Sequence, residues 1–121
     1  EPLPTWSRGR LTLLGDAAHP MLPHLGQGAN QAIEDGMALA TILAGASLKT
    51  VATALLAYEG LRRERVGSIQ RGARENGLRY DSANPDLGVR DAQIAAHAAF
   101  RRRLYDHDVV PEAETAALSL K

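Results

Sequence analysis

The residues with the clearest capacity for chemistry lie in one short stretch, where a glycine–aspartate pair opens a glycine-rich loop. Asp16 follows an apolar run, and its carboxylate offers two acceptor oxygens that suit the hydroxyls of a ribose or a ribityl chain. Gly26 and Gly28 come next, and their lack of side chains lets the backbone approach a flat ligand closely. The stretch therefore predicts a binding loop for a planar ligand that carries hydroxyl groups.

A helix is expected to begin at about Ala29, directly after this loop. The backbone N–H groups of Ala29 and Asn30 would then point along the helix axis without intrahelical partners. Free N–H groups at a helix N-terminus stabilise negative charge on a ligand. Because reduced flavin develops negative charge at the N1–C2=O edge of its ring, the loop and the helix start match what a flavin needs.

Two histidines in the loop invite a metal or a general-base interpretation. A metal would require further ligands, and Asp16 is the one carboxylate close by in the sequence, so we predict no metal site. His19 is expected to be a structural residue that holds the loop. His24, next to Pro23, is a candidate to face a substrate pocket.

The full register of the loop resembles the second flavin-binding motif of the group A flavoprotein monooxygenases, most closely the salicylate hydroxylase-like branch. The residues that carry this resemblance are Gly-Asp-Ala-Ala-His-Pro at 15–20, Pro23, Gly26, Gly28, Asn30 and Glu34-Asp35. The preceding strand, 10–14, is also similar. Looser matches follow at Tyr58-Glu59, Arg62, Arg65, 74–77 and 104–106.

The resemblance implies FAD as cofactor, NAD(P)H as co-substrate, and O2 and a small phenol or aromatic acid as the substrates of a hydroxylation. The cofactor carries such chemistry, while the protein supplies position and electrostatics. By the resemblance Asp16 binds hydroxyls of FAD, and the carbonyl of Pro23 lies near the reactive face of the flavin. The implied cofactor-binding residues are Asp16, Pro23, Gly26, Gly28, Ala29 and Asn30, and the implied catalytic residues are Pro23 and His24.

Two alternatives stay open. An FAD-dependent epoxidase or reductase can share the Gly-Asp motif, and a non-catalytic helical fragment can retain it. The Gly-x-Gly-x-x-Gly fingerprint for the ADP half of FAD and the family's middle Asp-Gly motif do not occur in this sequence. We therefore expect the chain alone to be inactive and its main partner to be the rest of the same polypeptide.

The elements around the loop predict a mainly α fragment, with one short strand followed by three helices. It would form part of an α/β FAD-binding fold of the p-hydroxybenzoate hydroxylase type. The apolar run 11–14 is typical of a strand buried on both faces. Helices are expected at about 29–44, 51–76 and 91–105, and the tail 112–121 has weaker helical character. We divide the chain into 1–45, with the strand, the flavin-contacting loop and the first helix, and 46–121, a C-terminal helical region.

Two helix faces can be assigned from the pattern. Ile33, Met37, Ala40 and Leu43 form an apolar stripe along the first helix, which predicts its buried face. The arginines between 62 and 79 are interleaved with glutamates and lack aromatic stacking partners. They predict a solvated helix face with ion pairs rather than a nucleic-acid surface.

The composition sets the remaining limits. The 121 residues suffice for one modest domain, and 14 basic side chains balance 14 acidic ones, which favours neither a nucleic-acid nor a membrane partner. The absence of cysteine excludes disulfides and fits a cytoplasmic protein.

There is no signal peptide, no apolar run of roughly 18 residues and no initiator Met, so we expect part of a longer chain. A homodimer is a further option.

Overall fold

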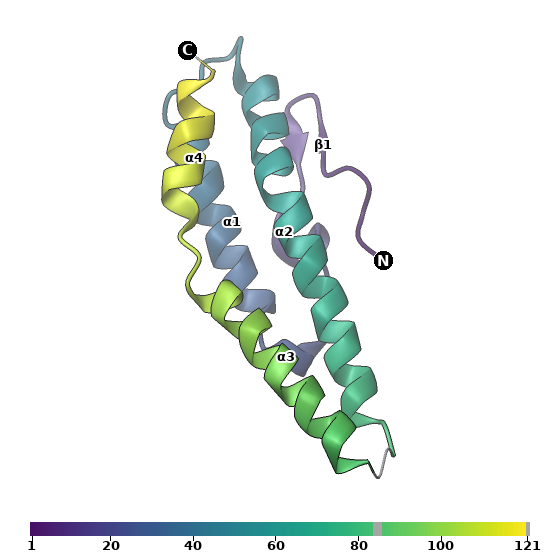
Figure 1. Cartoon of the computed structure of the whole chain (residues 1–121). Coiled ribbons are helices and arrows are strands. Elements are labelled where there is room, and N and C mark those ends of the chain that lie inside the picture. The colour runs from purple at the N-terminus through teal and green to yellow at the C-terminus, as the bar shows by residue number, and fades with distance from the viewer. Residues whose placement is uncertain (84–85, 121) are drawn as a thin grey trace.

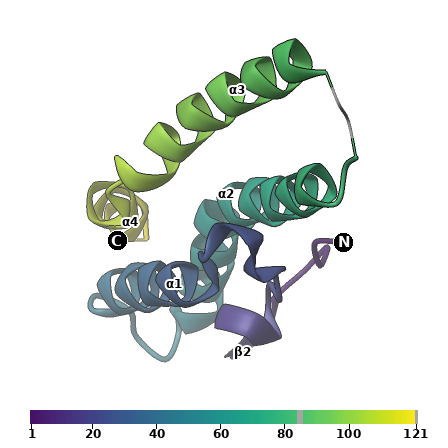
Figure 2. The ribbon, with the colours of Figure 1, turned by 90° about the horizontal axis from the view of Figure 1, so that it is seen from below.

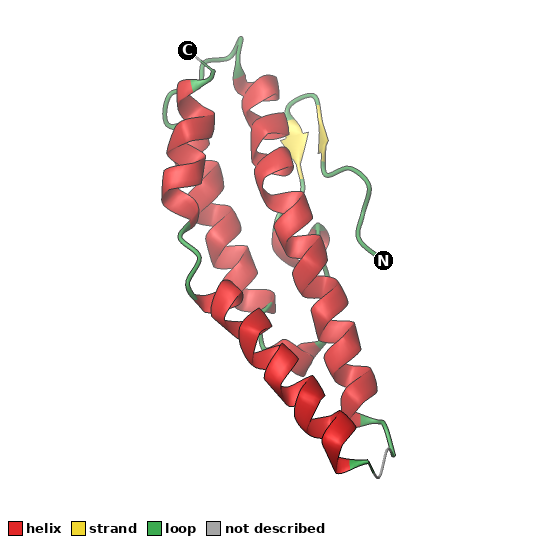
Figure 3. Cartoon of the chain, viewed as in Figure 1, coloured by secondary structure: helices red, strands yellow, loops and turns green. Residues whose placement is uncertain are grey.

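The computed structural model describes residues 1–83 and 86–120, and this part of the chain is mainly helical, as predicted (Figures 1 and 3). A small hairpin comes first and two short 3-10 turns follow it. The elements are β1 (Ser7–Arg8), β2 (Leu11–Thr12), η1 (Gly15–Ala17), η2 (Pro23–Leu25), α1 (Gly28–Leu43), α2 (Val51–Tyr80), α3 (Leu87–Tyr105) and α4 (Val109–Leu118).

The expected single buried strand at 11–14 is wrong in length and in surroundings. Strand β2 holds two residues and pairs antiparallel with β1, with Ser7 opposite Thr12. Gly9 has φ of +61° and makes the tight turn between them. Leu11 is 77% exposed, because within the described residues β1 is the sole strand beside β2 and nothing covers its outer face.

The expectation of three helices is also wrong, because the described residues form a fourth, α4, in the C-terminal tail. The Asp108 side chain caps it by accepting a hydrogen bond from the Val110 N–H at 3.0 Å. Helix α4 lies along α1 (Figure 1), and Val109 and Ala113 are buried in the core there. Packing against α1 anchors the tail, and sequence propensity alone does not reveal that contact.

The core joins the hairpin to three of the helices. Trp6, just before β1, and Tyr58 of α2 have ring centroids 6.0 Å apart, and both side chains are buried. Ile42 of α1 and Val66 of α2 belong to the same cluster. Helix α3 takes little part, and its ribbon lies to one side of α2 without crossing it (Figure 2). None of the described helices combines the length and the apolar character that a bilayer span requires.

Helix α2 continues through Gly77, although Asn76-Gly77 was expected to end it. The glycine has a packing role instead, since a Cβ placed on it would lie 2.6 Å from the ring of His24. Gly72 plays the same part for Phe100 of α3, whose ring would lie 2.7 Å from a Cβ. These two notches in α2 receive rings from η2 and from α3.

Replacing a notch glycine should therefore destabilise the protein, whereas replacing an open glycine should not. Gly77→Ala forces the His24 ring to move, and overpacking of this kind typically costs about 1–3 kcal/mol of unfolding free energy. Gly60→Ala is the matched control in the same helix, because a Cβ added there would meet no packed neighbour within 4 Å among the described residues. It should gain up to about 1 kcal/mol from helix propensity. Urea unfolding followed by circular dichroism measures both, and a stabilised Gly77→Ala would contradict this packing.

Candidate functional site

The loop between β2 and α1 carries the residues that the sequence singled out. It turns twice, at η1 and at η2, and the two turns require glycine. Gly15 has φ of +59° and Gly26 has φ of +62°, both in the left-handed region that other residues rarely adopt. Gly15 is also buried against Ala32 of α1, whose Cβ would lie 3.3 Å from an added Cβ. The backbone path of the loop is thus fixed by its sequence.

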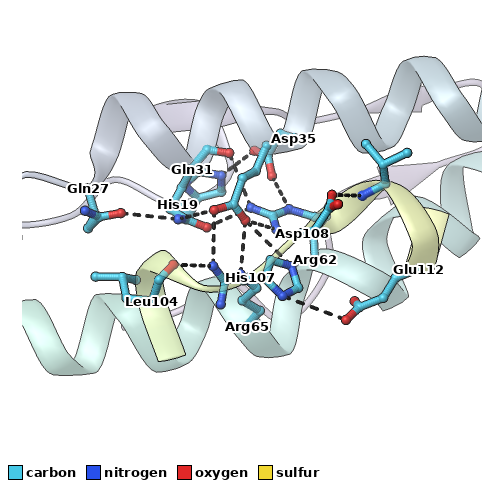
Figure 4. A network of polar contacts seen from close by, with 12 residues as sticks. His19, Gln27, Gln31, Asp35, Arg62, Arg65, Leu104, His107, Asp108 and Glu112 are labelled. Carbon is cyan, nitrogen blue, oxygen red and sulfur yellow. Dashed lines mark hydrogen bonds and ion pairs between the residues drawn. The ribbon is translucent and has the colours of Figure 1, made fainter. Parts of the chain in front are cut away.

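A buried carboxylate on α1 fastens this loop to the helices (Figure 4). Asp35 is fully buried and accepts hydrogen bonds on Oδ2 from the Gly15 N–H at 3.0 Å and from His19 Nε2 at 2.5 Å. Its Oδ1 accepts from Arg62 Nε at 2.8 Å. One side chain therefore joins the loop, α1 and α2, and His19 is structural, as predicted.

Arg62 is the cationic centre of the same cluster, and its prediction as part of a solvated face is wrong. The side chain is completely buried. It donates to Asp35, to Glu34 Oε2 at 2.7 Å, and to the side-chain oxygen of Gln31 at 2.8 Å. A buried guanidinium needs hydrogen-bond acceptors for its N–H groups, and one face of α1 supplies them.

A second arginine extends the cluster to the C-terminal helices. Arg65 binds both oxygens of Glu34, at 3.0 and 3.1 Å, and donates to the carbonyl of Leu104 at 3.1 Å. His107, between α3 and α4, lies 3.9 Å from Glu34 and 3.8 Å from Glu112. The polar network thus reaches from the loop to the start of α4.

Two opposing effects set the acidity of the buried carboxyls. Burial raises the pKa of Asp35, but the hydrogen bonds from His19, Arg62 and Gly15 outweigh it and lower the pKa below its ordinary 3.8. Burial likewise raises the pKa of Glu34, and Arg65 and Arg62 together lower it below 4.5. Both carboxyls are therefore ionised at neutral pH and hold their arginines in place.

The predicted apolar stripe of α1 does not form its buried face. Ile33 is 66% exposed and Met37 is 49% exposed, whereas the buried residues of the helix are Gln31, Asp35, Ala38 and Ile42. The buried face is polar at its N-terminal end because the acceptors for Arg62 lie there. Sequence reasoning missed this network. Its available signal was the spacing of Gln31, Glu34 and Asp35, which places three acceptors on one helix face.

The outward side of the loop presents the expected ligand-binding groups together. Gln27 precedes α1 without a side-chain cap, and the first bond of the helix runs from the Gln31 N–H to the Gln27 carbonyl at 2.9 Å. The N–H groups at 28, 29 and 30 come before that bond and have no intrahelical acceptor. Asp16 is exposed next to them, with Oδ1 3.8 Å from a Cβ placed on Gly28.

The two residues expected to be catalytic lie at the start of η2. Pro23 occupies its first turn and is exposed. The ring of His24 lies against Gly77 and 6.2 Å from the ring of Tyr80, and its carbonyl accepts a hydrogen bond from Asn76 at 2.7 Å. His24 therefore docks the loop onto α2 in this chain. Among the described residues, no three His, Cys, Asp or Glu side chains are grouped to hold a metal ion.

Comparison with known proteins agrees with this geometry. A family model described as "FAD binding domain" matches residues 3–73. The chain belongs to the FAD-binding domain family. The FAD-binding chain is 47% identical over 116 residues to the FAD-dependent monooxygenase notI of Aspergillus sp. (strain MF297-2), covering 92% of the chain and 25% of that protein. It is 36% identical over 121 residues to a salicylate hydroxylase of Pseudomonas putida, covering 98% and 28% respectively.

A solved structure leads to the same family. The FAD-binding chain superimposes on a salicylate hydroxylase substrate complex with a TM-score of 0.81 and 36% identity, over 95% of the chain and 29% of that structure. The resemblance inferred from the loop residues is thereby confirmed. The chain spans about a quarter of the length of the curated relatives that it matches.

The buried ion pair gives a first prediction for this site. Arg62→Met leaves Asp35 and Glu34 without their shared cation, and breaking a buried pair in this way costs about 3–5 kcal/mol of unfolding free energy. Arg63→Met is the matched control on the next position, since Arg63 is 45% exposed and pairs with Glu59 within one helix turn. It should cost at most about 1 kcal/mol. Similar losses in urea unfolding of the two variants would contradict the central role of Arg62.

The lowered pKa values give a second prediction. The folded-state pKa values of Glu34 and Asp35 lie below their ordinary 4.5 and 3.8, so the unfolded chain binds protons first as the pH falls. The stability that these groups contribute is complete above about pH 5 and is lost as the pH falls through the folded-state values. The urea midpoint should therefore stay level above about pH 5 and drop from there to about pH 3, and Glu34→Gln should flatten the drop. A midpoint that stays constant over this range would contradict the assignment.

Proposed function

We propose that this chain supplies the flavin-contacting loop of an FAD-dependent monooxygenase that hydroxylates a small phenol or aromatic acid, with NAD(P)H and O2 as co-substrates. The observation that carries the proposal is the group of free N–H donors at 28–30 beside the exposed carboxylate of Asp16. Asp16 lies in the loop and the donors begin the helix that follows it, and the buried Asp35 of that helix fastens the loop to it. Membership of the FAD-binding domain family supports the cofactor.

The donor set fits FAD on two sides. Asp16 could accept hydrogen bonds from hydroxyls of the cofactor, while the N–H groups of Gly28, Ala29 and Asn30 would hold the electron-rich pyrimidine edge of the ring. No acidic side chain lies in the first turn of α1 to weaken the positive end of its dipole. Gly26 and Gly28 keep side chains out of the approach. When bound, FAD would supply the hydride acceptance and the oxygen activation of the reaction.

The remaining roles follow from the same loop. We assign Pro23 the position beside the reacting face, where its carbonyl would orient the substrate. The role of His24 in facing the substrate stays a prediction, since its ring lies against Gly77 in this chain. Four further statements are likewise predictions. They are the division into 1–45 and 46–121, a cytoplasmic location, the rest of the same polypeptide as partner, and the formation of a homodimer.

The substrate class rests on the relatives. One of them is named as a salicylate hydroxylase, and a solved neighbour is a salicylate hydroxylase substrate complex. We extend this to the chain as a hydroxylated aromatic acid or phenol. Because the chain spans about a quarter of these relatives, the test must supply the remaining parts.

A chimera provides such a test. Replacing the matching segment of the Pseudomonas putida salicylate hydroxylase by this chain should give a yellow protein that retains FAD and shows salicylate-stimulated NADH oxidation. Visible absorbance after gel filtration measures the bound cofactor, and circular dichroism confirms folding. A folded chimera that takes up no FAD would refute the proposed function. Flavin uptake without substrate conversion would favour an epoxidase or reductase.

Within the chimera, Asp16→Ala should weaken FAD binding by about tenfold or more, because hydrogen bonds to a charged group contribute about 1.5–3 kcal/mol each. Asp91→Ala removes an exposed carboxylate of α3 and should leave the dissociation constant of FAD unchanged. Fluorescence titration with FAD measures both variants. Equal affinity for FAD in Asp16→Ala and in the parent chimera would contradict the assignment of Asp16 to the cofactor site.

A further inference from the structure

A second polar site lies away from the outward side of the loop, where η2, the end of α2 and α3 meet. A cavity of about 190 Å³ opens there. Leu104 of α3, which is buried, forms part of its wall. The ring of Phe100 seated at Gly72 and the ring of His24 seated at Gly77 set the spacing of the surrounding elements. Of these two rings, that of His24 lines the cavity itself.

Several side chains of the lining can donate hydrogen bonds. Arg101 and His97 come from α3, Tyr80 from α2 and His24 from η2. The guanidinium carbon of Arg101 lies 5.9 Å from the ring centroid of Tyr105, which also lines the cavity. Stacking over a ring reduces the conformational freedom of the guanidinium before any ligand arrives.

No carboxylate balances this charge among the described residues that line the cavity. Asn76, the remaining polar side chain of the lining, is engaged with the His24 carbonyl and with Arg79. Burial lowers the pKa of His97, and the positive charges of Arg79 and Arg101 lower it further. Arg101 in the lining therefore brings positive charge to the cavity, which favours an anion.

We propose that this cavity binds a small oxyanion, a phosphate or carboxylate group, with Arg101 as the principal partner. Guanidinium groups match such anions because they donate parallel N–H groups to two oxygens. The rings of His24 and His97 and the hydroxyl of Tyr80 supply further donors. The site shares His24 with the flavin-contacting loop, but Arg101, His97 and Tyr80 belong to other elements, and the proposal does not depend on the proposed function.

Nuclear magnetic resonance of the histidine rings tests the proposal on the 121-residue chain. Inorganic phosphate and benzoate are titrated separately at constant ionic strength, with chloride as the reference anion. Either probe should shift the ring signals of His24 and His97 in a saturable way and raise the pKa of His97, because a bound anion stabilises its protonated form. Saturation by phosphate alone or by benzoate alone supports the site and identifies whether it binds a phosphate or a carboxylate group. Shifts that fail to saturate, or that chloride reproduces, overturn the proposal.

Two variants separate a built site from general surface charge. Arg101→Gln should weaken binding of the effective probe by about tenfold or more, since it removes the charged partner. Arg102→Gln is the matched control, because its side chain is exposed on the same helix and does not line the cavity. It should leave the affinity unchanged. Tyr80→Phe, which keeps the ring and removes the hydroxyl, should weaken binding several-fold. Equal losses in Arg101→Gln and Arg102→Gln, both folded by circular dichroism, would overturn the site.

Discussion

The buried ion pair between Asp35 and Arg62 is the interaction on which the rest of the structure depends. Both side chains are completely excluded from solvent, and such charges are tolerated when each finds its hydrogen-bond partners. Asp35 finds them in Arg62, in His19 and in the backbone of Gly15. The need to satisfy one carboxylate thus brings together two helices and the loop that precedes α1.

This arrangement separates the inner and outer sides of the loop. On the inner side, the Gly15 N–H and the His19 ring are committed to Asp35. On the outer side, Asp16 is exposed beside the uncapped start of α1. A binding group that is held by buried contacts loses little entropy when a ligand arrives, so preorganisation of this kind favours affinity. Asp16 and Asp35, which are the same residue type, therefore lie in opposite environments, one exposed and one fully buried.

Small residues determine how closely the other elements approach. Ala38 of α1, Ala54 of α2 and Ala113 of α4 are fully buried and let the three helices pack near one another. Gly72 and Gly77 act similarly on α2, where they receive the rings of Phe100 and His24. The cavity beside Arg101 lies next to this packing, since the His24 ring that is seated at Gly77 also lines it. A site for small anions can arise in this way from packing that serves another element.

The sequence by itself determined the flavin-binding family, the mainly helical content and the turns of the loop before α1. These are local properties: the left-handed turns of Gly15 and Gly26, the acceptor at Asp16 and the helix start after Gln27 depend on neighbours in the chain. Only the tertiary structure decided that Arg62 is buried, that Ile33 is exposed, that His24 docks on α2 and that the tail folds as α4. Each of these depends on a partner distant in the sequence. An arginine on a helix has the same local pattern whether it faces water or a carboxylate 27 positions away. Burial of charge is decided by the partner, and the partner is known only when the chain is folded.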